Sequence, residues 1–115
     1  MPSERFPKTA RVRRRVEYLA LQRDGRRFHT PHLVLLRRPA VGARARLGVT
    51  VSKRIGNAVV RNRVKRLVRE VFRVRQASIH PPIDLVVIAK PGAERLTYAQ
   101  VAAEFAKSLA IALER

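Results

Sequence analysis

The chain has 115 residues, 46% of them hydrophobic, and carries 26 Lys and Arg against 8 Asp and Glu, a formal charge of +18. The length predicts a single domain over 1–115, and the apolar content excludes low-hydrophobicity disorder. Such a like-charged domain repels itself, so a polyanion such as nucleic acid is the expected partner, with a merely soluble basic protein as the alternative. The lack of cysteine excludes a disulfide framework and fits a cytoplasmic location. No apolar run reaches the length of a signal peptide or a membrane span.

The N-terminal part predicts a flexible arm over residues 1–9, which hold two prolines and little periodicity. A short helix is expected from Thr9, because apolar residues recur at helical spacing at Val12, Val16, Leu19 and Ala20. Asp24-Gly25 is a turn signal that ends this helix.

Extended segments follow the turn. Pro31 divides the first of them into a short edge piece over 27–30 and a strand over 32–38. The next strand alternates, with Leu47, Val49 and Val51 on one face and Gly48, Thr50 and Ser52 on the other. The first face is expected to be core, and the second, small and polar, suits contact with a ligand.

The stretch "GNAVVRNRVKRLVREVFR", residues 56–73, predicts a helix that Asn57 caps. Its apolar stripe consists of Val60, Val64, Leu67, Val68 and Val71, and cations occupy most of the remaining surface. Because no acid lies at the centre of these cations and Glu70 lies to one side of them, phosphate binding is favoured over a merely solvated face or an anionic membrane surface. Free amides at the start of the helix could hold one phosphate, or Gly56 could simply form a turn.

The C-terminal part predicts a strand and a helix. Pro81-Pro82 ends the basic helix, and the apolar run "DLVVIAK", 84–90, is typical of a central strand. Thr97 and Gln100 form a capping box for a final helix, whose inward residues are Val101, Phe105, Leu109 and Ala112. The order predicts an α+β fold or a split α/β sandwich, with helices on a small sheet. The succession of strand, helix and strand suggests a crossover between parallel strands.

No active site carried by the protein itself is predicted. The eight carboxylates are scattered along the chain, so each is expected to pair with an arginine or cap a helix rather than form a two-metal cluster. The histidines His29, His32 and His80 have no spacing that favours a metal site.

Residues 52–73, "SKRIGNAVVRNRVKRLVREVFR", resemble the signature of the protein subunit of bacterial ribonuclease P. In that family a Gly-Asn-Ala turn leads into a helix carrying Arg-Asn-Arg, then Lys-Arg and a further Arg. The stretches "RVRRRVEYLALQRDGRRF" and "DLVVIAKPGAERLTYAQV" are similar to the family's first helix and last strand, turn and helix, so the resemblance covers roughly residues 10–113.

The resemblance implies a small mixed sheet of about four strands packed with three helices, in the order α-β-β-β-α-β-α. The crossover through the basic helix would be left-handed, against the general rule. The implied activity is that of a hydrolase, the endonucleolytic removal of the 5′ leader from precursor tRNA. The implied partners are the catalytic RNA, which would hold Mg²⁺ and perform the chemistry, and precursor tRNA; neither a membrane nor a protein partner is required. A structural RNA-binding module of ribosomal type and a stand-alone nuclease are the alternatives.

The resemblance also implies two sets of site residues, and no catalytic or metal-binding residue in the protein. The set expected to contact the catalytic RNA is Arg61, Asn62, Arg63, Lys65, Arg66, Arg69, Lys53 and Arg54. The set expected in the cleft for the single-stranded leader is Tyr18, Arg15, Gln22, Leu36, Thr50 and Ser52. Tyr18 stands where the family has a stacking aromatic, although it could simply be a half-buried helix residue. Gln22 and Leu36 replace aromatics of some relatives, and Arg15 or Arg54 could compensate.

Overall fold

The structure is a computed structural model that describes residue 11, residues 15–40 and residues 42–114. For residues 17, 18, 21, 22, 24 and 111–114 it describes the backbone alone. The elements in chain order are α1 (Arg15–Asp24), β1 (Arg26–His29), β2 (Leu33–Pro39), β3 (Arg46–Thr50), α2 (Ala58–Arg75), β4 (Ile83–Ala89) and α3 (Tyr98–Glu114). Single 3₁₀ turns, η3 (Gln76–Ser78) and η4 (Ala93–Arg95), follow α2 and β4. The predicted arm over residues 1–9 lies outside the described residues.

The four strands form one mixed sheet in the order β1-β2-β4-β3. β4 lies inside the sheet, antiparallel to β2 and parallel to β3, while β1 pairs with β2 at one edge. The predicted central strand is therefore confirmed, as is the parallel crossover from β3 through α2 to β4. The left hand of this crossover stays a prediction.

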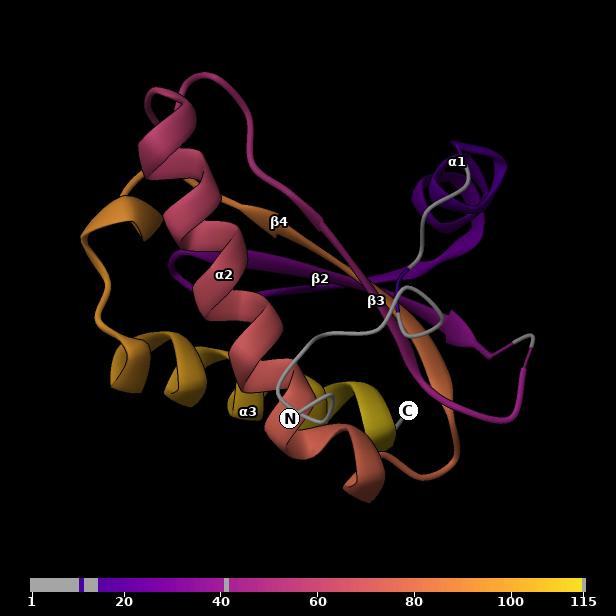
Figure 1. The fold of residues 1–115 in the computed structure, drawn as a ribbon. Coiled ribbons are helices and arrows are strands. Elements are labelled where there is room, and N and C mark those ends of the chain that lie inside the picture. The colour runs from indigo at the N-terminus through magenta and orange to yellow at the C-terminus, as the bar shows by residue number, and fades with distance from the viewer. Residues whose placement is uncertain (1–10, 12–14, 41, 115) are drawn as a thin grey trace, which may run out of the picture.

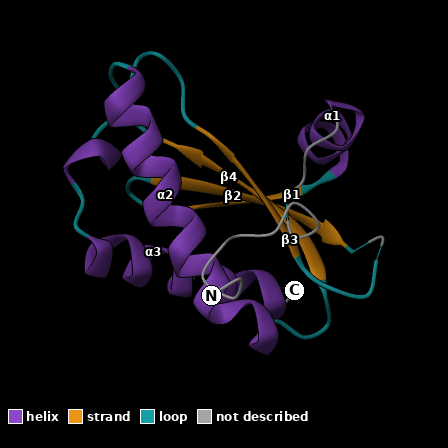
Figure 2. Ribbon diagram, viewed as in Figure 1, coloured by secondary structure: helices purple, strands orange, loops and turns teal. Residues whose placement is uncertain are grey.

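Two helices, α2 and α3, cover one face of the sheet (Figures 1 and 2), which we call the core face. Alternate strand residues such as Leu35 and Leu85 are buried here against Val68 of α2 and Phe105 of α3. Helix α1 lies on the other side of the sheet, against β2 and β4. The three helices of the described chain are therefore divided between the two faces of the sheet, and only α2 and α3 contribute to the main core.

The opposite face, here the α1 face, carries a small second cluster. Val34, Leu36 and Val86 are buried in it, and Ile88 packs against them. Val16 and Leu19 of α1 remain exposed, at 75% and 46% of their surface. The helical spacing that predicts α1 therefore does not mark residues of the main core.

The ends of α2 and α3 follow their predicted caps. The Asn57 side chain accepts a hydrogen bond from the Val60 N–H at 3.0 Å. Thr97 and Gln100 exchange side-chain and backbone hydrogen bonds of 2.9 and 3.2 Å, which is the capping box. At Gly56 an added Cβ would stand 2.9 Å from the Val60 side chain, so the turn into α2 approaches the helix too closely for any other residue without movement.

The apolar stripe of α2 is confirmed with one addition. Val64, Val68 and Val71 are buried and Val60 and Leu67 pack against the core, but Phe72, which the stripe does not include, is also fully buried. Among the described residues, no helix is long and apolar enough to cross a membrane.

Candidate nucleic-acid interface

Helix α2 holds a row of cations at intervals of four residues, formed by Arg61, Lys65, Arg69 and Arg73, which we call the cation row. Residues four apart lie on nearly the same side of a helix, so the row runs along its length. All four side chains are partly exposed. Asn62 and Arg66 stand beside the row and are exposed to solvent.

Arg63 points away from this row. Its guanidinium donates to the backbone carbonyl oxygens of Glu94, at 2.9 Å from Nη1, and of Leu96, at 3.4 Å from Nη2. The side chain therefore joins α2 to the η4 segment that leads into α3. Its expected contact with the catalytic RNA stays a prediction, and its structural role is one that sequence patterns did not show.

The turn between β3 and α2 presents two more of the predicted RNA-binding residues. Lys53 and Arg54 are both exposed there, in a turn closed by a hydrogen bond of 3.1 Å from the Ile55 N–H to the Ser52 carbonyl oxygen. Arg61 Nε donates to the Gly56 carbonyl oxygen at 3.2 Å, which fixes the turn to the first part of α2. The structure thus brings Lys53 and Arg54 to the same end of the molecule as the start of the cation row.

The residues expected to meet the leader come from different elements. Arg15 is exposed at the start of α1, which also carries Tyr18 and Gln22, whose side chains lie outside the described part of the chain. Leu36 is fully buried on the α1 face. Of the other two, Thr50 is half-buried at the end of β3 and Ser52 is exposed just beyond it. The leader cleft stays a prediction.

One end of the α1 face carries charges that the sequence analysis did not select. The Asp84 carboxylate is completely buried and accepts two hydrogen bonds from Arg46, at 3.1 Å from Nε and 2.8 Å from Nη2. Arg38 stands opposite Asp84 across the β2–β4 pair, and its buried Nε has no partner among the described residues. Only the strand register brings these residues together, so no local signal could have identified them.

The remaining described carboxylates with resolved shifts are also engaged. Hydrogen bonds from Arg73 lower the pKa of Glu70, and backbone N–H groups of its own residue and Gly92 lower the pKa of Glu94. Burial acts to raise the pKa of Glu104, but hydrogen bonds from Thr30 and His32 outweigh it and lower that pKa. The expected Arg pairing is thus confirmed for Glu70 and Asp84, while Glu104 pairs with His32 instead. Within residue 11 and the described ranges from 15 to 114, no three His, Asp or Glu side chains are grouped to hold a metal ion.

A mixed four-stranded sheet bearing a helix with a cation row defines a basic α+β protein suited to a polyanionic partner. The family model described as Ribonuclease P matches residues 6–113 of the sequence. The chain belongs to the family of ribonuclease P protein components, which function in tRNA processing as parts of a ribonucleoprotein.

Curated relatives agree with this assignment. The ribonuclease P protein component of Desulfovibrio desulfuricans is 48% identical over 103 residues, covering 86% of this chain and 79% of the relative. The ribonuclease P protein component of Citrifermentans bemidjiense is 41% identical over 106 residues, covering 92% of this chain and 90% of the relative.

Solved structures show the same fold. The Staphylococcus aureus RNase P protein superposes with a TM-score of 0.83 at 31% identity, covering 91% of this chain and 96% of that one. The RNase P protein from Thermotoga maritima superposes with a TM-score of 0.78 at 30% identity, covering 86% of this chain and 94% of that one.

Proposed function

We propose that the chain is the protein subunit of a ribonuclease P that removes the 5′ leader from precursor tRNA, with the chemistry performed by the RNA subunit. The observation that carries this proposal is the cation row of α2 and its neighbouring turn, on a chain that belongs to the ribonuclease P protein family. We expect the protein to act in the cytoplasm and to need no protein partner.

The contact with the catalytic RNA is assigned to the basic end of the molecule. Arg61, Lys65 and Arg69 of the row, together with Arg66 and the turn residues Lys53 and Arg54, would neutralise phosphates. Asn62 can donate or accept a hydrogen bond among them. Arg63 would contribute chiefly by holding α2 against η4, as its two hydrogen bonds suggest.

The contact with the leader is assigned to α1 and the adjoining sheet. Arg15 and Tyr18 on α1, with Thr50 and Ser52 at the end of β3, would meet the single strand by charge, stacking and hydrogen bonds. Gln22 and Leu36 replace aromatic side chains of some relatives, and Leu36 is fully buried. We therefore expect charge to contribute more to leader binding here than in relatives that have those aromatics.

Mg²⁺ is assigned to the RNA subunit in this proposal. The described His, Asp and Glu side chains form no group able to hold the ion, and Asp84 and Glu104 are already bound to Arg46 and His32. The ion would neutralise charge on the RNA and supply the metal needed for phosphodiester hydrolysis.

The direct test is cleavage of a 5′-extended precursor tRNA at low, near-physiological Mg²⁺. Three reactions are compared: a bacterial RNase P RNA alone, this protein alone, and the two together. We expect efficient cleavage to a mature 5′ end only in the mixture. If the protein adds nothing to the RNA, a general RNA-binding module becomes the better account, and cleavage by the protein alone would establish a protein nuclease.

A further inference from the structure

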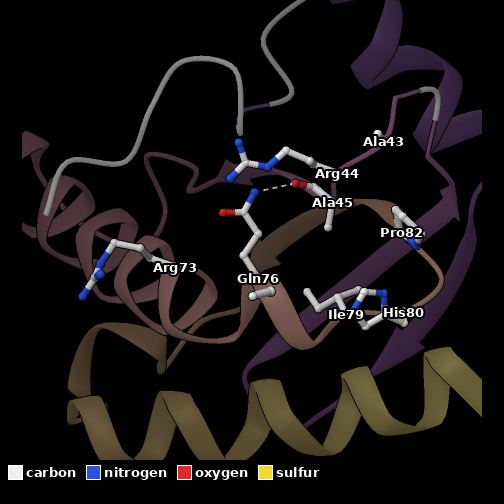
Figure 3. Close-up of a pocket in the computed structure, with 9 residues that line it drawn as sticks. Ala43, Arg44, Ala45, Arg73, Gln76, Ile79, His80 and Pro82 are labelled. Atoms are coloured by element: carbon white, nitrogen blue, oxygen red, sulfur yellow. Dashed lines mark hydrogen bonds between the residues drawn. The ribbon is translucent and has the colours of Figure 1, made fainter. Parts of the chain in front are cut away.

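A pocket of about 280 Å³ lies at the far end of α2 from the Gly56 turn (Figure 3). Three segments form it: the loop before β3, the last turn of α2 with η3, and the turn that enters β4. The lining residues are Ala43, Arg44, Ala45, Arg73, Gln76, Ala77, Ile79, His80 and Pro82. Sites for drug-sized molecules occupy roughly 300–1,000 Å³, so the volume of this pocket suits one small group.

The walls of the pocket combine apolar surface with oriented polar groups. Gln76 donates from its Nε2 to the Ala45 carbonyl oxygen at 2.9 Å, which fixes the side-chain amide. Its oxygen then lies on the side of Arg73 (Figure 3) and is available as an acceptor for an amino or imino N–H. His80 is exposed at the rim, where an imidazole ring can stack on a planar ligand.

The cations of the pocket continue the cation row. Arg73 is its last member and also lines the pocket, about 18 Å along the helix axis from Arg61 at 1.5 Å per residue. Glu70 holds the Arg73 guanidinium through hydrogen bonds of 3.1 and 2.5 Å. Arg44, from the loop before β3, also lines the pocket, is exposed and has no partner among the described residues. A strand whose phosphates follow the row would therefore reach the pocket and meet a further cation there.

We propose that this pocket takes a single unstacked nucleotide of an RNA, with the base against Gln76 and His80 and its phosphate beside Arg44. The inference rests on the proposed function, because it requires an RNA partner. The nucleotide could belong to the RNA subunit or to precursor tRNA, since both offer the same chemistry. Unpaired bases are the usual targets of such pockets because they can be splayed out and stacked.

The first test fills the pocket without changing charge. Ala77 is exposed and lines the pocket, so Ala77→Phe should occupy it, while Ala99→Phe places the same ring at an exposed position on α3. Loss of one stacked base is expected to weaken RNA affinity about tenfold in Ala77→Phe, with an unchanged salt dependence, and to leave Ala99→Phe at the wild-type value. Thermal unfolding of both variants checks that they fold.

The second test removes the charge. Arg44→Ala should weaken binding and lower the log–log salt slope by about 0.7–0.9, whereas Lys107→Ala, at an exposed position on α3, should not. Should Ala77→Phe fail to fold, His80→Ala replaces it as the variant that leaves the arginines unchanged. It should show the same loss of RNA affinity, with no change in the log–log salt slope.

Site-directed cross-linking identifies the source of the nucleotide. Because the chain has no cysteine, Ala77→Cys is a unique attachment point for a photoreactive group, with Ala99→Cys as the control. A cross-link at one nucleotide of either the RNA subunit or the precursor tRNA, labelled separately, supports the proposal. Wild-type affinity in Ala77→Phe together with no Ala77-specific cross-link would overturn it. Stimulation of cleavage by the wild-type protein is measured in parallel, so failure of the pocket is distinguishable from failure of the proposed function.

Discussion

Glu104 ties the segment between β1 and β2 to α3. One carboxylate oxygen accepts from the Thr30 hydroxyl at 2.7 Å and from the His32 N–H at 2.9 Å, and the other lies 2.6 Å from His32 Nδ1. Lys90 Nζ, just after β4, donates to the Thr30 carbonyl oxygen at 2.8 Å. The His32 ring also fills the space beside Gly92, whose φ of 102° favours glycine. These contacts fix the ends of β2 and β4 to the last helix.

The Glu104 contacts predict a pH-dependent stability difference. Because the pKa of Glu104 is lowered on folding, its stabilising effect is complete above the unfolded-state value of about 4.3 and is lost as the pH falls through the lower folded-state value. We expect Glu104→Gln to lower the free energy of unfolding by about 1–3 kcal/mol at pH 7. Urea titrations at pH 7 and near pH 3.5 measure this, and the gap to wild type should shrink at the lower pH. A gap that stays constant with pH would contradict the assignment.

The Arg46–Asp84 pair predicts a larger effect. Asp84 is completely buried, and the Arg46 side chain is only 20% exposed, so removing the guanidinium leaves a buried carboxylate without its bidentate partner. We expect Arg46→Met to cost about 3–5 kcal/mol, measured by urea unfolding. Adding Asp84→Asn to the same chain should recover part of this loss, because it removes the uncompensated charge. Unfolding of Arg46→Met at the wild-type urea concentration would rule out this role for the pair.

At the scale of elements, α2 divides its polar residues between structure and surface. Arg63 donates to the carbonyl oxygens of Glu94 and Leu96, whereas Arg66 is exposed and has no partner among the described residues. Both belong to the same predicted RNA-binding set, so a sequence motif alone does not separate their roles.

This division predicts that two matched substitutions on α2 affect different quantities, one the free energy of unfolding and the other the affinity for RNA. Arg63→Ala should lower the free energy of unfolding by about 1 kcal/mol, because it removes charged hydrogen bonds at a partly solvated site. Arg66→Ala should leave stability within about 0.5 kcal/mol of wild type and weaken binding to the RNA subunit. Chemical unfolding and a filter-binding titration of each variant measure the two quantities. Equal losses of stability in both variants would contradict the structural role of Arg63.

Local sequence signals predict the helices and strands well, because the residues that start and end these elements contact partners only a few positions away in the chain. Asn57 caps α2 through Val60, and Thr97 pairs with Gln100, each over three residues. Long-range contacts left no such signal: Glu104 meets Thr30 across 74 residues, and Arg46 meets Asp84 across 38. The pocket was missed for the same reason, since its walls come from three separate segments. In the candidate site, the cations of α2 followed from helical spacing, but the orientation of Arg63 depended on the position of η4.

At the scale of the whole molecule, the net charge of +18 predicts a strong salt dependence of RNA binding. Each phosphate that the protein neutralises should add about −0.7 to −0.9 to the slope of log affinity against log salt. We expect the steep slope of a contact with several phosphates between low and moderate salt, measured by titration with the RNA subunit. Arg66→Ala should reduce the slope by the value for one phosphate, and a slope near zero would exclude the cation row as the binding surface.

The position of β4 in the sheet has a consequence for synthesis. β4 is fourth in the chain, yet it is the strand that joins β3 to the β1–β2 hairpin. While the ribosome is still making α2, β3 therefore has no strand to pair with, and the core face cannot close. We therefore expect the basic helix to reach its final position only after residues 83–89 have emerged and joined β2 to β3.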